Sequence, residues 1–273
     1  MEQRRMQLDG HERKYIVIPP FEADPTTPRD LVLFFHGSMQ SPGVIRRFTN
    51  GTFDALSHRG AVVVYPGGVK NHFNDARANL PEKTRELGVD DVKFTQVLVA
   101  QMRKEFAIAR VFACGYSNGG QMVLRLLIDA PGLLSGAAIF AATLPADDNF
   151  AANNPLSSYQ PTPVIFFHGT KDWLSPYEGG VAGLDQVRTR GRVISAPATV
   201  QKFAELNDAG AAIITRPYSD VEQTLYPGEN PVALWTLEGV GHVIPSGNEL
   251  DPRLGPNTTS FIAAEAVAEF FKL

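Results

Sequence analysis

A serine between glycines is the residue of this sequence with the clearest potential for chemistry. It lies in Gly115-Tyr116-Ser117-Asn118-Gly119, directly after the apolar run 110–114. The pattern G-x-S-x-G is typical of a strand that turns sharply into a helix and exposes the serine hydroxyl. Larger flanking side chains would collide with the neighbouring strand and helix. An ordinary strand-to-helix turn is the alternative interpretation, so the rest of the chain must supply the partners of a nucleophile.

A base and an acid that could activate Ser117 both follow it in the chain. Asp172 lies in the loop after the apolar run 164–167, and His242 lies in a glycine-flanked loop after the run 232–237. An imidazole can accept the serine proton, and a carboxylate can hold that imidazole in the required tautomer. We therefore predict a catalytic triad of Ser117, Asp172 and His242. The alternatives are a helix N-cap for Asp172 and a structural role for His242.

Acyl transfer through a serine also requires donors for the oxyanion of the tetrahedral intermediate. The backbone N–H of Asn118 is one expected donor, and Ser38 in the loop HGSMQ, residues 36–40, is expected to supply the other.

We expect His36 and His168 to anchor loops. The chain has neither the H-E-x-x-H spacing of a zinc site nor the lysine of a phosphate-binding loop, and it has a single cysteine. The sequence therefore predicts no metal, no cofactor and no disulfide.

Short apolar runs separated by helical segments predict the elements that position these residues. Runs that are apolar at every position are typical of parallel strands covered on both faces. They occur at 31–35, 61–65, 110–114, 137–141, 164–167 and 232–237. Helices are predicted after Asp90 or Asp91, with an apolar stripe of Val92, Val97, Val99 and Met102, after Ser117, and over 260–271. This alternation predicts a three-layer α/β sandwich with a mostly parallel sheet.

The whole chain, residues 1–273, is expected to form one domain with a small loop-rich cap. Two segments rich in Asn, Pro, Gly and Ser, 142–162 and 173–197, follow predicted strands. The carboxyl edge of an open α/β sheet is where ligands bind, and both segments would lie over that edge. The predicted triad residues also follow strands, so a parallel sheet would bring them to the same edge.

Composition and charge exclude several other classes of function. Hydrophobic residues make up 44% of the chain and charged residues 20%, which is typical of a soluble globular protein. The net charge is only −4, and no run of lysine or arginine indicates a nucleic-acid or membrane partner. The first twenty residues lack the apolar core of a signal peptide, so a cytoplasmic location is expected.

Several separate blocks of the sequence resemble one family of enzymes. They are LDGHERKYIVIPP, LVLFFHGSMQSP, FNDAR at 73–77, GVDDVKF, VFACGYSNGG, PVIFFHGTKDWLSPY and GVGHVIPSG, and together they extend over about positions 8 to 245. In this order they resemble esterases of the polyhydroxybutyrate depolymerase and feruloyl esterase type. The resemblance implies an α/β-hydrolase fold, serine-dependent hydrolysis of carboxylic esters, and the same assignment of Ser117, Asp172 and His242.

The departures from the family pattern suggest a small-molecule ester as the substrate. Family members with paired cysteines and export signals act on polymers, whereas this chain lacks both features, so small soluble esters are expected. Six residues near the predicted strand ends are candidates for substrate binding: Met39, Phe73, Asn74, Arg77, Trp173 and Tyr177. Packing at the rim is the alternative for Phe73 and Trp173, and an internal hydrogen-bond network is the alternative for Asn74, Asp75 and Arg77. A thioesterase, a peptidase and a noncatalytic binding protein of the same fold are the alternative functions.

Overall fold

The computed structural model describes residues 1–22, 27–184 and 188–273, which form a ten-stranded sheet, a two-stranded hairpin and helices. The centre of the large sheet consists of parallel strands in the order β4, β3, β5, β6, β7, β12. Their bounds are Val62–Pro66, Arg29–Phe35, Ile108–Tyr116, Gly136–Phe140, Val164–Gly169 and Val232–Leu237. Each of the six predicted strands is therefore present, and the mostly parallel sheet is confirmed.

Antiparallel strands extend the sheet at both edges, and the sequence analysis missed them. β1 (Glu2–Leu8) and β2 (His11–Ile18) pair beyond β4, and β11 (Val221–Tyr226) and β10 (Ile213–Tyr218) pair beyond β12. Strands exposed on one face alternate apolar and polar residues instead of forming continuous apolar runs. β1, for example, is EQRRMQL, and it has no fully buried residue. A search for continuous runs does not detect β1, whereas β2 ends in the apolar run 15–18, which the sequence analysis did not count as a strand.

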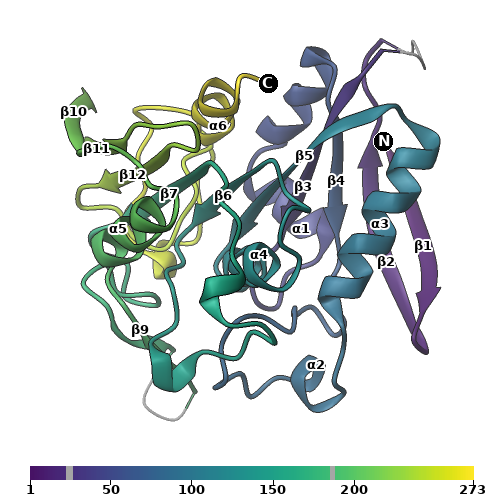
Figure 1. Ribbon diagram of the computed structural model, residues 1–273, viewed down its shortest axis with the longest axis horizontal. Helices are drawn as coiled ribbons and strands as arrows, with labels where there is room; N and C mark the ends of the chain where they lie inside the picture. Colours follow the sequence, from purple (N-terminus) through teal and green to yellow (C-terminus); the bar gives the residue numbers. More distant parts are fainter. Residues whose placement is uncertain (23–26, 185–187) are drawn as a thin grey trace.

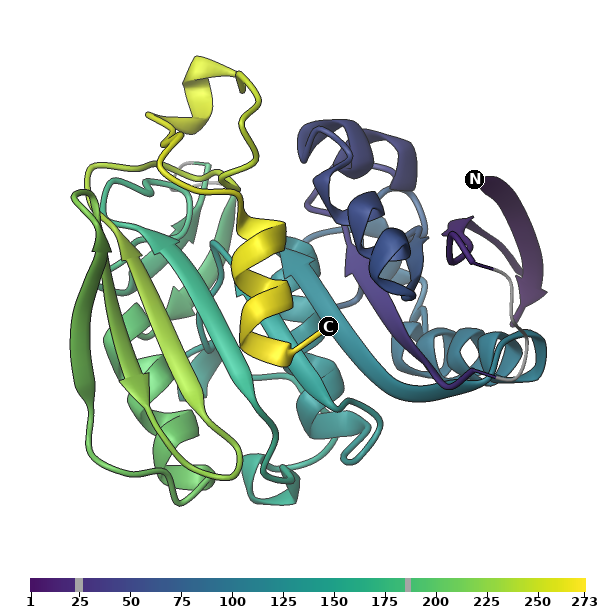
Figure 2. The same cartoon turned by 90° about the horizontal axis from the view of Figure 1, so that it is seen from above.

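Helices cover both faces of the sheet and complete the three layers (Figures 1 and 2). α3 (Asp91–Glu105), α4 (Asn118–Asp129) and α5 (Ala196–Leu206) pack on one face. α1 (Pro42–Phe48), the 3-10 helix η1 (Thr52–Arg59) and α6 (Ala263–Phe271) pack on the other. The four-residue helix α2 (Lys83–Glu86) lies in the long connection before α3. Each face has its own apolar core, which is why the central strands are apolar at every position.

The predicted helix after Asp90 is α3, with one correction to its apolar stripe. The Asp90 carboxylate caps the helix by accepting a hydrogen bond from the backbone N–H of Lys93 at 2.9 Å. Val97 was predicted to be in the core but is 37% exposed. Phe94 and Leu98 are buried instead. Three or four residues separate neighbours on one helix face, and Val97 lies five residues after Val92, on the outward side of the helix.

The two loop-rich segments contact each other. Segment 142–162 contains the 3-10 helices η2 (Asp147–Asn149) and η3 (Leu156–Ser158), and segment 173–197 contains the hairpin of β8 (Gly180–Gly183) and β9 (Thr189–Val193). Residues 185–187 of the second segment lie outside the described residues. Backbone hydrogen bonds join Ala146 to Arg192 and Ile194 to Leu144, both at 3.0 Å. Within the described ranges, every helix is too short or too polar to cross a membrane.

The turn that carries Ser117 depends on direct contact between backbones. A Cβ atom at Gly119 would lie 2.1 Å from the carbonyl oxygen of Phe35 at the end of β3. A Cβ atom at Gly115 would lie 2.3 Å from the carbonyl oxygen of Gly119. Atoms cannot approach so closely, so glycine at both positions allows the first turn of α4 to pack against the ends of β3 and β5.

We expect Gly119→Ala to lower the free energy of unfolding by about 1–3 kcal/mol, because the added methyl group must displace backbone. Urea unfolding followed by circular dichroism measures this change. Gly43→Ala is the matched control, because the nearest atom to a Cβ there is the Arg47 side chain at 3.5 Å. Its helical position in α1 favours alanine, so the control should be neutral or stabilising. Equal stability of the two variants would contradict the packing argument.

His36 links the loop after β3 to the loop after β4. Its Nδ1–H donates to the carbonyl oxygen of Gly37 at 2.8 Å, and its Nε2 accepts from the backbone N–H of Gly68 at 3.0 Å. The imidazole must be neutral to accept the second bond. Burial lowers the pKa of His36 to about 4. The predicted loop-anchoring role of His36 is consistent with this geometry.

The low pKa of His36 predicts a loss of stability in acid. Between pH 6.5, the ordinary value, and about 4, the unfolded chain binds a proton at this residue and the folded chain does not. The contribution of neutral His36 to the free energy of unfolding is therefore complete above pH 6.5. Below pH 6.5 this contribution falls by about 1.4 kcal/mol per pH unit, until the pH reaches about 4. Urea unfolding at pH 7, 6 and 5, together with an NMR titration of the His36 ring, measures the effect. A ring that titrates near 6.5 in the folded protein would contradict the prediction.

Candidate active site

Ser117 occupies the turn between β5 and α4 in a conformation that residues with a side chain rarely adopt. Its φ is 54° and its ψ is −114°. Such a conformation costs roughly 1–3 kcal/mol, so the surrounding packing must hold it. Its backbone N–H donates to the carbonyl oxygen of Phe140 at 2.9 Å, which ties the turn to β6. Ser117 lines a cavity, and its Oγ makes no hydrogen bond within the described part of the chain.

Asp172 and His242 are joined directly. Nδ1–H of His242 donates to Oδ2 of Asp172 at 2.7 Å, and Oδ1 of Asp172 accepts from the backbone N–H groups of Leu174 and Ser175 at 3.0 and 2.8 Å. Burial acts to raise the pKa of Asp172, but the interactions with His242 outweigh it and hold that pKa below its usual range. The ionised carboxylate therefore fixes the proton on Nδ1 and leaves Nε2 of His242 as the nitrogen that can accept a proton.

His242 is held in place through its backbone as well as its ring. The carbonyl oxygen of His242 accepts from the Tyr116 hydroxyl at 2.7 Å, and its N–H donates to the carbonyl oxygen of Leu254 at 2.6 Å. The Tyr116 ring packs against the imidazole with 5.1 Å between ring centroids. His242 and Ser117 line the same cavity, although no hydrogen bond joins them among the described residues. Hydrogen bonds of this kind are often formed only when substrate is bound.

His168 supports the loop that carries Asp172. It is buried at the end of β7, and its Nε2–H donates to the carbonyl oxygen of Ser175 at 2.7 Å. Burial lowers the pKa of His168, so the imidazole is neutral at pH 7. Nε2 also lies 3.5 Å from Oδ2 of Asp172. This side chain holds the loop that carries Asp172 in position, and it does not line the cavity.

The backbone N–H groups of Asn118 and Ser38, the two expected oxyanion donors, have no acceptor among the described residues. Asn118 N–H belongs to the first turn of α4, where the helix provides no acceptor. Neither it nor Ser38 N–H donates a hydrogen bond within the described ranges, whereas Met39 N–H donates to the carbonyl oxygen of Asn71 at 3.0 Å. Met39 is thus engaged, and Asn118 and Ser38 have the free N–H groups that the sequence analysis predicted to bind an oxyanion.

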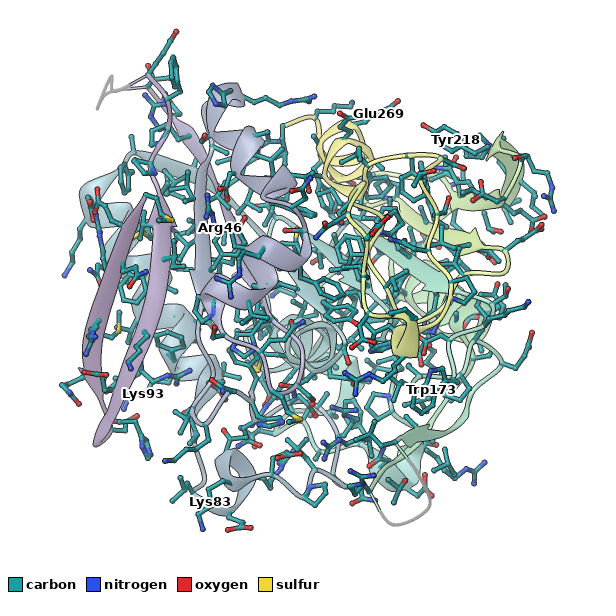
Figure 3. The ribbon with its side chains drawn as sticks, turned by 180° about the vertical axis from the view of Figure 1, so that it is seen from behind. Arg46, Lys83, Lys93, Trp173, Tyr218 and Glu269 are labelled. Carbon is teal, nitrogen blue, oxygen red and sulfur yellow. The ribbon has the colours of Figure 1, made fainter. Side chains whose placement is uncertain are left out.

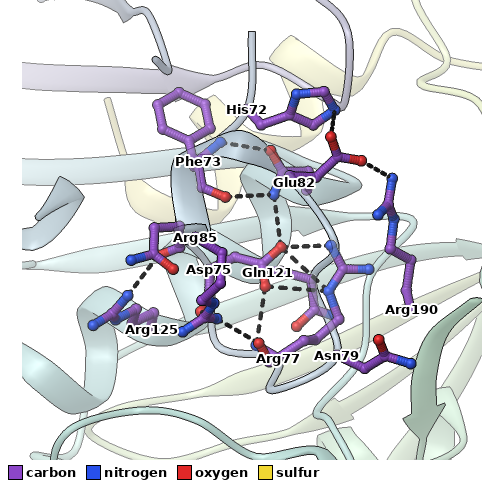
Figure 4. A network of polar contacts seen from close by, with 12 residues as sticks. His72, Phe73, Asp75, Arg77, Asn79, Glu82, Arg85, Gln121, Arg125 and Arg190 are labelled. Carbon is purple, nitrogen blue, oxygen red and sulfur yellow. Dashed lines mark hydrogen bonds and ion pairs between the residues drawn. The ribbon is translucent and has the colours of Figure 1, made fainter. Parts of the chain in front are cut away.

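The Asn118 side chain connects the serine turn to the loop 73–77. Its Oδ1 accepts from the backbone N–H of Phe73 at 2.9 Å, and its Nδ2 donates to the carbonyl oxygen of Phe73 at 3.0 Å. The same amide donates to Oδ2 of Asp75 at 2.6 Å. Asp75 also binds the guanidinium group of Arg77, with 2.5 Å between Oδ2 and Nη2 (Figure 4). The residue after the serine therefore positions an arginine of the cavity through one carboxylate.

The predicted substrate-binding residues divide into two groups. Met39 and Arg77 line the cavity. Phe73 is fully buried and packs on Phe35 and His36, and Asn74 binds the Val89 carbonyl oxygen and the Asp91 carboxylate. The Asn74 side chain thus belongs to the internal network given as its alternative, and the enclosed Phe73 ring has a packing role.

Trp173 and Tyr177 also lie outside the cavity lining. The Trp173 indole is 48% exposed at the surface (Figure 3), and its N–H donates to the carbonyl oxygen of Arg253 at 3.0 Å. The Tyr177 hydroxyl forms a hydrogen bond with Thr236 Oγ1 at 2.7 Å, and its ring packs against His168. Trp173 is thus bound to the loop after His242, and Tyr177 is bound to β12. The contact of Trp173 with Arg253 agrees with the alternative interpretation, in which Trp173 packs at the rim.

The sequence analysis missed several residues that line the cavity. Gln121 lies one helical turn after Ser117, and the period of α4 could have identified it. Its Nε2 donates to the carbonyl oxygen of Thr143 at 2.7 Å, whereas its buried Oε1 has no partner among the described residues, which costs about 1–3 kcal/mol. Arg190 on β9 had no sequence signal that placed it here. The other missed lining residues are Gln40, Tyr116, Ala141, Ala142, Leu174, Ser175, Ala182, Gly183, Leu184 and Leu254.

The cavity that these residues enclose has a volume of about 210 Å³. Sites for drug-sized ligands are typically about 300–1,000 Å³. Its wall combines the carboxyl edge of the sheet, which carries Ser117 and His242, with the β8–β9 hairpin, which contributes Ala182, Gly183, Leu184 and Arg190. A small ligand with a few polar groups is the best fit to this space.

Comparison with known proteins agrees with this geometry. Residues 67–189 match the phospholipase/carboxylesterase family. The chain is 27% identical to NocK of Nocardia uniformis subsp. tsuyamanensis, an esterase by name, over 89% of this chain and 74% of that one. It is 26% identical to feruloyl esterase B of Piromyces equi, over 84% of this chain and 42% of that one. The match to a carboxylesterase-named protein of Oryza sativa subsp. japonica spans only 32% of that protein.

The similarity to solved structures concerns the fold. The acetyl xylan esterase of Aspergillus awamori aligns with a TM-score of 0.65 and 13% identity, over 100% of this chain and 99% of that one. The predicted resemblance to feruloyl esterases is supported, and the resemblance to polyhydroxybutyrate depolymerases stays a prediction. The chain therefore has the α/β-hydrolase fold, and its central part matches the phospholipase/carboxylesterase family.

Proposed function

We propose that this protein is a carboxylic ester hydrolase that acts on small esters through an acyl-enzyme at Ser117. The observation that carries the proposal is the convergence of Ser117, in its strained turn, and His242, hydrogen-bonded to Asp172 at 2.7 Å, on one cavity. A surface serine or a capping aspartate would not require this arrangement. The esterase names of the relatives support the same reaction class.

In the first half of the proposed reaction, Ser117 Oγ attacks the carbonyl carbon of the ester. Its proton passes to Nε2 of His242, and the resulting imidazolium is stabilised by the Asp172 carboxylate. The carbonyl oxygen becomes an oxyanion, which the backbone N–H groups of Ser38 and Asn118 would bind. The intermediate then collapses, the carbon–oxygen bond to the alcohol breaks, and His242 returns the proton to the departing alcohol.

In the second half, water replaces the alcohol. His242 takes a proton from the water as its oxygen attacks the acyl carbon, and the bond to Ser117 Oγ breaks. The proton returns to Ser117, and the carboxylic acid leaves. Both halves need one nitrogen that alternates between accepting and donating a proton, and Nε2 of His242 is the nitrogen that the Asp172 hydrogen bond leaves available.

We further propose that segments 142–162 and 173–197 form a cap on a single domain. The β8–β9 hairpin supplies part of the cavity wall, and hydrogen bonds from Asn149 to the carbonyl oxygens of Arg190 and Arg192, each at 2.9 Å, hold it against the first segment. Such a cap would exclude water from the ester and limit its size.

Ser117→Ala and His242→Ala should each lower kcat/KM for p-nitrophenyl butyrate by at least about a thousandfold, because they remove the nucleophile or its base. A fluorophosphonate probe should label the wild-type protein at Ser117 and should not label Ser117→Ala. A matched anilide is the control for peptidase activity, and butyryl thiocholine is the control for thioesterase activity. An unlabelled wild-type protein with turnover no higher than Ser117→Ala would refute the proposal.

Tyr116→Phe should lower kcat roughly tenfold with KM nearly unchanged, because the carbonyl oxygen of His242 loses its partner and the imidazole is held less firmly. Steady-state kinetics with p-nitrophenyl butyrate separates the two parameters. Tyr159→Phe is the matched control, since its buried hydroxyl bonds Asn207 Oδ1 at 2.8 Å away from the cavity. Equal losses of kcat in both variants would indicate a general loss of stability and would contradict the positioning role.

A further inference from the structure

Two arginines from distant segments of the chain line the cavity together. Arg77 follows β4 in the loop 73–77, and Arg190 lies on β9 of the cap hairpin. Ester hydrolysis itself does not require a guanidinium group, and the proposed reaction uses neither side chain. Their place in the wall of a small cavity therefore requires a separate explanation.

Each arginine is held by a carboxylate but retains N–H groups without a protein partner. Arg77 binds Asp75 through Nε and Nη2, and Arg190 binds Glu82 through Nη2. Nη1 of Arg77 and the Nε and Nη1 groups of Arg190 donate no hydrogen bond within the described residues. They are also not among the enclosed polar atoms, so they are accessible to a ligand in the cavity.

The network behind the cavity carries more positive than negative charge (Figure 4). Arg85 donates from Nη2 to the carbonyl oxygens of Asp75 and Arg77 at 3.0 and 2.5 Å, and it has no carboxylate partner in the described chain. Arg125 is paired with Asp129 at 2.9 Å and adds no net charge. Three guanidinium groups, those of Arg77, Arg85 and Arg190, thus face only two carboxylates, those of Asp75 and Glu82. An additional anion would balance the network.

Gln121 lines the cavity beside the arginines, and its side chain is almost fully enclosed. The residue is 2% exposed, and its Oε1 has no partner among the described residues. The amide orientation is fixed, because Nε2 donates to the carbonyl oxygen of Thr143. This oxygen is enclosed by protein atoms, so the groups of this wall that a ligand can reach are the unpartnered N–H groups of Arg77 and Arg190.

We infer that the cavity binds an ester that carries a carboxylate in addition to its ester group, and that Arg77 and Arg190 hold this carboxylate. This inference rests on the proposed function and adds the class of substrate. Planar guanidinium forks match the planar geometry of a carboxylate. Arg77 is fixed by Asp75, whose Oδ2 also binds Asn118, so its remaining N–H group is held ready. The small cavity favours a short chain, as in a half-ester of a dicarboxylic acid.

Matched pairs of esters test the inference. Monoethyl glutarate and ethyl pentanoate differ only in a carboxylate for a methyl group on the acyl side, and 4-acetoxybutanoate and butyl acetate differ in the same way on the alcohol side. We expect kcat/KM to favour the charged member of one pair by at least about tenfold, as charged hydrogen bonds typically contribute. The pair that shows the preference identifies the side of the ester that carries the carboxylate.

Two substitutions that break the same ion pair have opposite expected effects. Arg190→Gln removes a cation and should reduce the preference for the charged ester to about threefold or less. Glu82→Gln releases Arg190 from its carboxylate and should increase that preference. If the ion pair only held the cap hairpin in place, both variants would change the ratio in the same direction, and that result would overturn the inference. Arg216→Gln, on the exposed strand β10, is the control and should leave the ratio unchanged.

Calorimetric binding to Ser117→Ala separates this inference from the proposed function. Monoethyl glutarate and 4-acetoxybutanoate should each be titrated into Ser117→Ala. One of the two should have a Kd at least about tenfold lower than that of its neutral counterpart, ethyl pentanoate or butyl acetate. This preference should be lost when Arg190→Gln is added. Binding of this kind without turnover by the wild-type protein would refute the esterase proposal and retain the carboxylate site. Turnover of the neutral esters with no charged preference in either assay would refute the carboxylate site alone.

Discussion

Direct backbone contact between α4 and the ends of β3 and β5 is the constraint on which the rest of the site depends. Gly119 meets the Phe35 carbonyl oxygen, and Gly115 meets Gly119, with no room for a Cβ atom between them. This contact holds Ser117 in its strained turn at the start of α4. The proposed nucleophile and one proposed oxyanion donor therefore have their positions set by main chain, which has few alternative arrangements.

The other groups reach the cavity because the central strands are parallel. β5, β7 and β12 all point the same way, so the loops that follow them carry Ser117, Asp172 and His242 to one edge of the sheet. Hydrogen bonds within these loops then refine the positions. The Asp172 loop is tied to His168, and the His242 loop is tied to Tyr116 and Leu254. The sheet brings the residues together, and these local bonds set their orientation.

Sequence predicted the parts of this structure that depend on local pattern. Continuous apolar runs identified the central strands, and strand ends placed Ser117, Asp172 and His242 at one edge. β1 was missed because its apolar Met6 and Leu8 are separated by a polar residue, and Val97 was misplaced because it lies five residues after Val92, away from the buried helix face. Arg190 could not have been found, since its position in the cavity wall depends on the tertiary packing of the β8–β9 hairpin. Phe73 and Asn74 were in the right block, but only packing shows that they are enclosed.

The backbone and the side chain of Asn118 have different roles. Its backbone N–H is the proposed oxyanion donor, while its side chain binds Phe73 and Asp75 and, through Asp75, fixes Arg77. A substitution in the loop 73–77 that altered ligand choice would also shift the start of α4. A change of specificity is therefore better placed in the β8–β9 hairpin, whose described residues line the cavity and form no hydrogen bond with Ser117 or Asn118.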